Sequence, residues 1–361
     1  MTADSYFSSN YAEARGKFLD AAARAGAAVS HFANPAPGPQ GETLFADTAW
    51  FGPKDSGRVL FTISATHGVE GFCGSGVQTG WFESGLYKDM PPGTALLAVH
   101  GINPHGFAWL RRVTEGNVDL NRNFIDHAQP YPHNEAYEEL HGALCPREWN
   151  DAVIALTGKV LEAYLEKHGT RALQAAISAG QYRHSDGLFF GGGASTWSRD
   201  TLIAIMESAL AKARHVALVD YHTGLGPRGY GERICAHATG SEALARAGQW
   251  YDGDITSPFL GTSSSVELHG VNLLGIEEAL SHAVLTAIAL EYGTLPTDQV
   301  KLALRADNWL HAHGDPASAK GRAIKDQIRD AFYQDASDWK TMIWERGVET
   351  QKLALKGLAE G

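Results

Sequence analysis

In Arg58-Val59-Leu60-Phe61-Thr62-Ile63-Ser64-Ala65-Thr66-His67-Gly68-Val69-Glu70, a strand pattern runs directly into two side chains that bind metals well. The first half of this stretch is an apolar and β-branched run of strand length. His67 and Glu70 follow it, and both imidazole and carboxylate are good ligands for Zn²⁺. Gly68 lets the backbone turn sharply between them. Because sites in open α/β sheets form beyond the carboxyl ends of the strands, we expect the pair at such an edge.

The composition is that of a globular chain with an acidic surface. Its 361 residues are enough to bury a full core, and 44% of them are apolar. Lys and Arg number 30 against 41 Asp and Glu, which gives a formal net charge of −11. Nucleic acids and anionic membranes need basic patches, so neither is an expected partner. No internal repeat and no long linker divide the sequence, and we expect one domain over residues 1–361.

The N-terminus and the cysteines favour a cytoplasmic location. Met1-Thr2-Ala3-Asp4-Ser5 lacks the basic and then apolar pattern of a secretory signal. The longest apolar runs are too short to span a bilayer. The three cysteines, Cys73, Cys145 and Cys235, cannot all pair with one another, and reduced thiols are the simplest interpretation. The oligomeric state stays open, and a homo-oligomer is compatible with the sequence.

Helical and strand patterns alternate along the chain. We expect an N-terminal helix over about 9–29, a turn-rich connector at Asn34–Pro39 and a helical C-terminal tail over about 302–358. The expected strands are Thr43–Trp50, Arg58–Thr66, Thr94–His100, His215–Tyr221 and Val284–Tyr292. This alternation predicts one α/β domain with flanking helices.

Two later strands also end on residues that suit a metal site. His222 follows the third buried strand, and Glu291 lies at the end of the last one. Two histidines and one glutamate, here His67, Glu70 and His222, leave one open position on a tetrahedral Zn²⁺, as catalytic sites do. Glu291 is then the candidate that takes a proton from water bound at that position.

A polar segment after the second buried strand supplies candidates for substrate binding. Arg122 lies between Asn121 and Asn123 and offers a planar fork to a carboxylate. Either Arg112 or Arg111 could stabilise an oxyanion. Asp119 could hold a ligand histidine by its second ring nitrogen, which is a common supporting role in metal sites.

Taken in order, these residues resemble the zinc carboxypeptidase family, the carboxypeptidase A-like metallopeptidases. The closest likeness is to the bacterial branch of that family that is described only as a domain of unknown function. The resemblance runs from about residue 55 to residue 295. It rests on His67-Gly68-Val69-Glu70, Asn103-Pro104-His105-Gly106-Phe107, Asp119-Leu120-Asn121-Arg122-Asn123-Phe124, His222 and Glu291.

The resemblance implies a fold, a metal site and a general base. The fold is a three-layer α/β/α sandwich with a central mixed, mostly parallel sheet of about eight strands. His67, Glu70 and His222 would bind one Zn²⁺ per chain. Glu291 would act first as general base and then as proton donor.

The resemblance also implies roles in substrate binding. Asn121 and Arg122 would hold a terminal carboxylate, and Asp119 would support His67. Arg112 fits the position of the family's catalytic arginine better than Arg111, because its spacing to the Asn-Arg pair and its following residues match better.

One feature of the family is missing. Carboxypeptidases of this type place a mobile tyrosine some twenty residues before the catalytic glutamate, and here no tyrosine lies between Tyr251 and Tyr292. Tyr230 or Tyr251 could serve from another loop. The gap leaves room for relatives that remove acyl groups from amino acids.

The expected function is therefore a zinc-dependent hydrolysis of an amide bond next to a free carboxylate. A metallocarboxypeptidase that releases a C-terminal residue from peptides is the leading form. An N-acyl amino acid deacylase or an esterase would use the same metal site, and a metal-binding protein without turnover is a third interpretation. In each enzymatic case the partner is a small peptide or an acylated amino acid.

Overall fold

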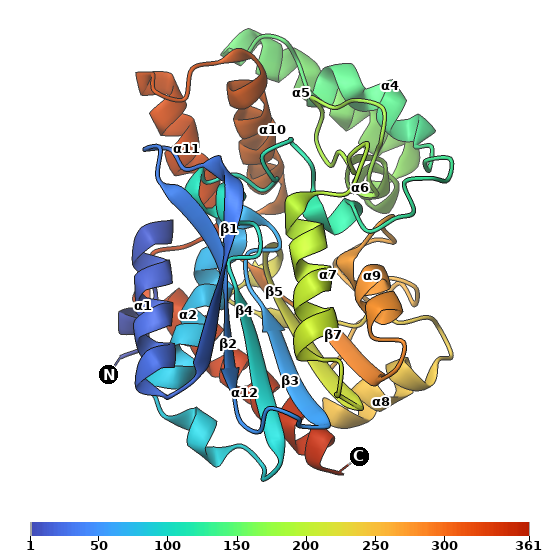
Figure 1. The fold of residues 1–361 in the computed structure, drawn as a ribbon. Helices are drawn as coiled ribbons and strands as arrows, with labels where there is room; N and C mark the ends of the chain where they lie inside the picture. The colour runs from blue at the N-terminus through green and yellow to red at the C-terminus, as the bar shows by residue number, and fades with distance from the viewer. Residues whose placement is uncertain (1, 361) are drawn as a thin grey trace.

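The computed structural model describes residues 2–360, and within them one sheet of seven strands forms the centre of the molecule (Figure 1). The strands lie in the order β1-β2-β4-β3-β5-β7-β6. Their bounds are β1 Ala28–Pro37, β2 Thr43–Phe51, β3 Arg58–Ile63, β4 Thr94–His100, β5 His215–Arg228, β6 Gly231–Ile234 and β7 Val284–Gly293. Strands β4, β3, β5 and β7 are mutually parallel, while β2 and β6 run antiparallel to their neighbours. The expected mixed, mostly parallel sheet is confirmed, with seven strands in place of about eight.

Helices cover both faces of the sheet and one of its ends. The helices are α1 Tyr11–Arg24, α2 Gly71–Glu83, α3 Pro104–Ala108, α4 Glu135–Leu144, α5 Asp151–His168, α6 Thr170–Ser178, α7 Trp197–Ala209, α8 Glu242–Trp250, α9 Asn272–Ala279, α10 Thr297–His313, α11 Ala319–Phe332 and α12 Ser337–Glu360. Figure 1 shows α1, α2 and α12 on one face and α7 and α9 on the other, with α4, α5, α6, α10 and α11 gathered at one end. None of the helices within residues 2–360 combines the length and the apolar character needed to cross a membrane.

The side-chain alternation of the strands divides the core into two layers. Leu60 of β3 packs into the core beneath α1, α2 and α12, whereas Val59 and Phe61 pack into the core beneath α7 and α9. Successive side chains of a strand point to opposite faces, so a strand that is apolar throughout needs a helical layer on each side. The three-layer arrangement therefore follows from the apolar character of the central strands.

The N-terminal region differs from the expectation. The first helix ends at Arg24 and not near residue 29, and residues expected as its end and as a connector form strand β1. This strand pairs only with β2, and its register shifts between Ala33 and Pro37. Proline is tolerated at an edge strand, because one side of the strand has no ladder bonds to lose. The prolines therefore suggested a connector where the structure has a strand. In the C-terminal region, expected to be helical over about 302–358, the chain forms α10, α11 and α12.

Candidate metal centre

His67, Glu70 and His222 converge at the carboxyl edge of the sheet. His67 Nδ1 lies 2.9 Å from Glu70 Oε1 and 3.1 Å from His222 Nδ1, and His222 Nδ1 lies 3.3 Å from Glu70 Oε2. All three side chains are buried, with 4% or less of their surface exposed. Within residues 2–360, these three form the group of His, Cys, Asp or Glu side chains whose geometry could hold a metal ion.

The backbone around His67 explains how the pair is placed. The chain leaves β3 at Ile63, and Gly68–Glu70 forms a single 3-10 turn that leads into α2. Gly68 packs against the backbone of α3, and a Cβ there would lie 2.0 Å from the Gly106 carbonyl carbon. Glycine is therefore required at this position by close packing and not by the backbone angle, since Gly68 does not have a positive φ. His222 comes from β5, where it lies opposite Glu291 of β7.

Each histidine of the cluster has a carboxylate on its other ring nitrogen. His67 Nε2 lies 3.2 Å from Asp119 Oδ1, and His222 Nε2 lies 2.9 Å from Asp220 Oδ2. The sequence identified Asp119 but missed Asp220. A signal for it existed, because residues two apart on a strand point to the same face and Asp220 precedes His222 by two positions on β5.

This arrangement fits a divalent cation. The Asp220 carboxylate at His222 Nε2 favours the tautomer that leaves Nδ1 free for a metal. At His67 Nε2, Asp119 favours the same tautomer, whereas the donor Arg112 Nη2 favours the other one. Both Nδ1 atoms lie close to the Glu70 carboxylate. Burial alone would raise the pKa of Glu70, but His67, His222 and Arg112 outweigh it and hold that pKa well below its ordinary value. Glu70 is therefore an anion, and two imidazoles with one carboxylate are a donor set that Zn²⁺ prefers.

Glu291 lies beside the cluster on β7. Its Oε1 accepts a hydrogen bond of 3.0 Å from the Leu225 backbone, and 8% of the residue is exposed. Burial, with a smaller contribution from the nearby charge of Glu70, raises the pKa of Glu291 to about 8. A cation bound at the cluster would lower it again, since positive charge favours the carboxylate. This carboxyl group can therefore hold or release a proton near neutral pH.

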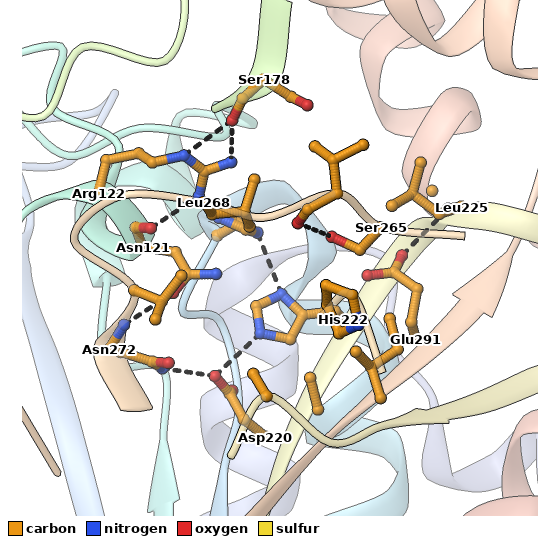
Figure 2. Close-up of a pocket in the computed structure, with 18 of the residues that line it drawn as sticks. Asn121, Arg122, Ser178, Asp220, His222, Leu225, Ser265, Leu268, Asn272 and Glu291 are labelled. Atoms are coloured by element: carbon orange, nitrogen blue, oxygen red, sulfur yellow. Dashed lines mark hydrogen bonds and ion pairs between the residues drawn. The ribbon is translucent and has the colours of Figure 1, made fainter. Parts of the chain in front are cut away.

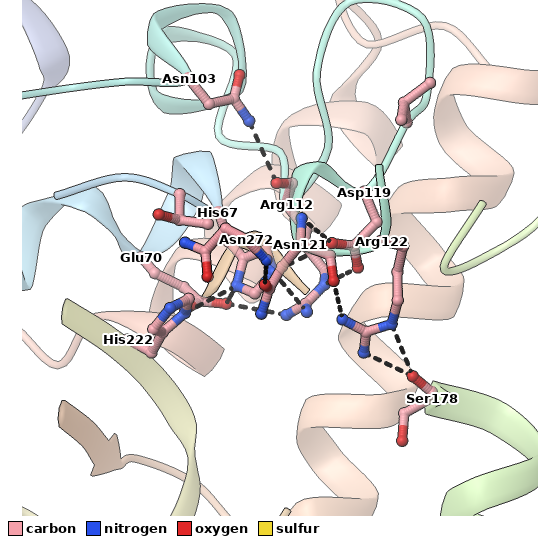
Figure 3. Close-up of polar contacts among 12 residues, drawn as sticks. His67, Glu70, Asn103, Arg112, Asp119, Asn121, Arg122, Ser178, His222 and Asn272 are labelled. Atoms are coloured by element: carbon pink, nitrogen blue, oxygen red, sulfur yellow. Dashed lines mark hydrogen bonds and ion pairs between the residues drawn. The ribbon is translucent and has the colours of Figure 1, made fainter. Parts of the chain in front are cut away.

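The two candidate arginines point in different directions. Arg112 lies against the cluster, with Nη1 3.0 Å from Glu70 Oε1 and Nε 2.9 Å from Asp119 Oδ2 (Figure 3). Its Nη2 also lies 2.7 Å from His67 Nε2. Arg111 faces away and donates to Asp307 Oδ2 at 3.3 Å. Of the two, only Arg112 lines the cavity that contains the cluster.

Asn121 and Arg122 line the same cavity and approach it from the 3-10 turn Leu120–Arg122. Arg122 Nε and Nη2 donate to the Ser178 carbonyl at 3.0 and 2.5 Å, and Nη1 donates to the Asn121 carbonyl at 2.6 Å. Burial lowers the pKa of Arg122 to about 10, against the opposing charge of Asp119. The guanidinium therefore also closes the C-terminal end of α6, a structural role that the sequence did not indicate.

The cavity extends from His67 and His222 into a largely apolar region, and Figure 2 draws part of its lining. Its apolar lining includes Ile234, Ala236, Leu268, Val271 and Ala287. No tyrosine within residues 2–360 lines it. Tyr251 is fully buried in the core and Tyr230 is 46% exposed elsewhere, so neither takes the place of the family's mobile tyrosine in this structure.

The fold is similar to that of a solved carboxypeptidase, and two further solved structures match with lower TM-scores. Carboxypeptidase A from Helicoverpa armigera is 12% identical, and the match covers 98% of this chain and 74% of that one with a TM-score of 0.53. Bovine thrombin-activatable fibrinolysis inhibitor matches with 10% identity, 98% of each chain and a TM-score of 0.45. Murein-tripeptide amidase MpaA from Escherichia coli O157 matches with 15% identity, 82% of this chain, 91% of that one and a TM-score of 0.35. No curated protein matches the chain in sequence.

The protein is therefore an α/β protein with a carboxypeptidase-like fold and a His-Glu-His cluster at the carboxyl edge of its sheet. Within this class, the chain belongs to the family described as "Protein of unknown function (DUF2817)", whose model matches residues 7–346. The resemblance stated from the sequence, both to the carboxypeptidase fold and to a branch of unknown function, is thereby confirmed.

Proposed function

We propose that this protein is a zinc-dependent hydrolase that cleaves an amide bond next to a free carboxylate, with one Zn²⁺ held by His67, Glu70 and His222. The observation that supports it best is that one cavity is lined both by the two histidines of the cluster, His67 and His222, and by the Asn121–Arg122 pair. A metal at this cluster would supply an activated water and polarise the substrate carbonyl.

The other roles are assigned to side chains that surround the cluster. Glu291 accepts a proton from water and later donates it to the leaving amine, because its carboxyl group is buried beside the cluster. Arg112 stabilises the negative charge that develops on the carbonyl oxygen. Asn121 and Arg122 orient the substrate through its carboxylate, and Asp119 supports His67.

Peptides are the leading substrate class, and N-acyl amino acids are the second. The second class is favoured by one observation, since no tyrosine of residues 2–360 lines the cavity where carboxypeptidases of this type use one. An esterase activity would require no further groups, because ester cleavage demands less assistance to the leaving group than amide cleavage.

A paired substrate panel tests the proposal. Short peptides and N-acyl amino acids, each with a free and an amidated carboxylate, are incubated with zinc-loaded and chelator-treated protein. We expect zinc-dependent hydrolysis of the free-carboxylate members of at least one class. Hydrolysis that persists after the metal is removed would contradict a zinc mechanism. Zinc binding without turnover on any substrate would instead support the non-catalytic interpretation.

A further inference from the structure

A chain of buried hydrogen bonds links a ligand histidine to the residue expected to bind the substrate carboxylate. Asp220 Oδ2 lies 2.9 Å from His222 Nε2 and accepts a bond of 2.6 Å from Asn272 Nδ2 (Figure 2). The backbone N–H of Asn272 donates to Asn121 Oδ1 at 2.9 Å. Asp220, Asn272 and His222 are each 7% exposed or less, so water scarcely competes for these bonds.

The chain continues on the other side of Asn121. Its backbone N–H donates to Asp119 Oδ1 at 3.0 Å, and the same oxygen lies 3.2 Å from His67 Nε2. His67 Nδ1 and His222 Nδ1 lie 3.1 Å apart, so the contacts form a closed ring around the site. Figure 3 shows the part of the ring around His67, Asp119 and Asn121, and Figure 2 shows the contacts of Asp220. The ring consists of His67, Asp119, Asn121, Asn272, Asp220 and His222.

Asp220 is held so that it can orient His222. Its Oδ1 and Oδ2 accept from Thr66 Oγ1 at 2.9 and 3.1 Å, while Oδ2 also contacts His222 and Asn272. A carboxylate that is fixed by donors on several sides cannot rotate with the imidazole. The His222 ring is therefore kept with Nε2 toward Asp220 and Nδ1 toward the cluster.

Asn272 fixes which end of the Asn121 side chain is available to the cavity. The Asn121 Oδ1 atom is engaged by the Asn272 backbone, whereas Nδ2 has no hydrogen-bond partner within residues 2–360. An amide NH₂ donates and therefore attracts an anion, but an amide oxygen in the same place would repel a carboxylate. The contact with Asn272 thus selects the orientation of Asn121 that suits a carboxylate.

We propose that Asp220 and Asn272 are positioning residues that tie the metal ligand His222 to the carboxylate-binding Asn121. Asp220 sets the direction of the His222 ring. Asn272, at the start of α9, contacts both Asp220 and Asn121 and so fixes the Asn121 amide relative to that ring. This inference rests on the proposed function, because it assigns supporting partners to the same site. Both residues act through others, and neither needs to touch the substrate.

The variants Asn272→Ala and Asp220→Asn test this assignment. Zinc affinity is measured by competition with a chromogenic chelator, and kcat and KM are measured on a substrate with a free carboxylate and on its carboxamide. For Asp220→Asn we expect a zinc Kd that rises about 10–100-fold, the usual effect of losing a carboxylate behind a ligand histidine. For Asn272→Ala we expect KM for the free carboxylate to rise on the order of 10-fold while kcat and the carboxamide kinetics change little.

Leu274→Ala is the matched control, because Leu274 lies in the same first turn of α9 and is 50% exposed. It should keep the wild-type zinc Kd and KM ratio. The role of Asn272 would be overturned if Asn272→Ala raised KM by the same factor for the free carboxylate and the carboxamide, or left both KM values unchanged. If Asp220→Asn binds zinc with the wild-type Kd, the role of Asp220 is overturned. This zinc measurement still tests the proposal if the Asn272→Ala variant fails to fold. If the wild type binds zinc but hydrolyses neither substrate, the proposed function fails while the zinc affinities still test Asp220.

Discussion

At the scale of single residues, the site combines buried charges that stabilise one another. Asp119 and Arg112 form an ion pair at 2.9 Å, and Arg112 also lies 3.0 Å from Glu70. Burial would raise the pKa of Asp119, but Arg112, Arg122 and His67 hold it well below its ordinary value. Buried charges persist only when they are paired, so removing one partner leaves the other exposed to a large desolvation cost. Functional tests at this scale therefore need substitutions that keep shape.

Glu291→Gln is such a substitution, because it keeps the size and polarity of the side chain and loses only its ability to accept a proton. We predict retained zinc, nearly unchanged KM and a kcat lower by roughly 10²–10⁴, the usual contribution of a positioned general base. Glu267→Gln is the control, since Glu267 is an exposed carboxylate of the same cavity. Steady-state kinetics decide between the two outcomes, and a near-normal kcat in Glu291→Gln would remove Glu291 from the mechanism.

Arg122→Lys tests whether Arg122 binds the substrate carboxylate. Lysine keeps the positive charge but cannot reproduce a planar fork that already donates to the Ser178 and Asn121 carbonyls. We predict that KM for the free-carboxylate substrate rises by about 10-fold or more, which corresponds to at least about 1.4 kcal/mol. The carboxamide should be affected less. If KM rises by the same factor for both substrates, Arg122 serves only to bind the Ser178 and Asn121 carbonyls.

At the scale of elements, close packing of α2 against the sheet brings Glu70 into place. Helix α2 contains glycines whose missing side chains allow the approach, and a Cβ at Gly74 would lie 2.7 Å from Ser64 Cβ and 2.8 Å from Tyr221 Cβ. By contrast, a Cβ at the exposed Gly16 of α1 would meet nothing within 4 Å. Glycine to alanine can therefore be compared at a closely packed helix position, Gly74, and at an exposed one, Gly16.

Gly16→Ala should stabilise the protein by up to about 1 kcal/mol, because alanine favours a helix over glycine. Gly74→Ala should destabilise it by about 1–3 kcal/mol despite the same gain in propensity, because overpacking pushes α2 away from the sheet. Urea unfolding measures both. Equal stabilisation of the two variants would show that α2 does not depend on this close approach.

Strand β4 contains a histidine that is held neutral. His100 is buried, its ring stacks on Phe18, and its Nε2 lies 2.8 Å from Ser75 Oγ. Burial lowers the pKa of His100 from 6.5 to about 4, with Asp47 opposing and Arg15 adding to the shift. The unfolded chain therefore binds a proton between these two values that the folded chain does not. The stability is fully present above pH 6.5 and is lost as the pH falls toward 4.

His100→Gln should remove this dependence. Between about pH 6.5 and pH 5, we predict that the wild type loses about 1 kcal/mol per pH unit more than the variant, on average. Urea unfolding at several pH values measures the difference, and the exposed His313→Gln serves as control. If the wild type and His100→Gln lose stability with the same slope, His100 takes up its proton in the folded protein.

The sequence predicted those parts of the fold and site that depend on local patterns. The central strands, the turn at His67 and the cluster of His67, Glu70 and His222 could be found because each is encoded by neighbouring residues or by a strand end. Strand β1 could not, since its prolines are acceptable only at the edge that the tertiary structure gives it. Asn272 had no sequence signal, because its contacts depend on how a distant loop folds back.

At the scale of the whole molecule, the metal is expected to add to a fold that stands without it. The core extends over both faces of the sheet, and a chain of this size does not need a metal to fold. A ligand that binds only the folded state adds about 2.7 kcal/mol at a hundred times its Kd. Zinc should therefore raise the melting temperature without being required for folding.

The zinc content of the purified protein tests the central claim most directly. Protein is loaded with zinc and dialysed to remove loosely bound ions. The amount of zinc per chain is then measured by inductively coupled plasma mass spectrometry. We predict about one zinc per wild-type chain, the stoichiometry of a site with three protein ligands and one open position. The double variant His67→Ala, His222→Ala should remain folded by circular dichroism and bind almost none. A wild type without zinc, or a double variant with full occupancy, would contradict the assignment of His67, Glu70 and His222 as the metal site.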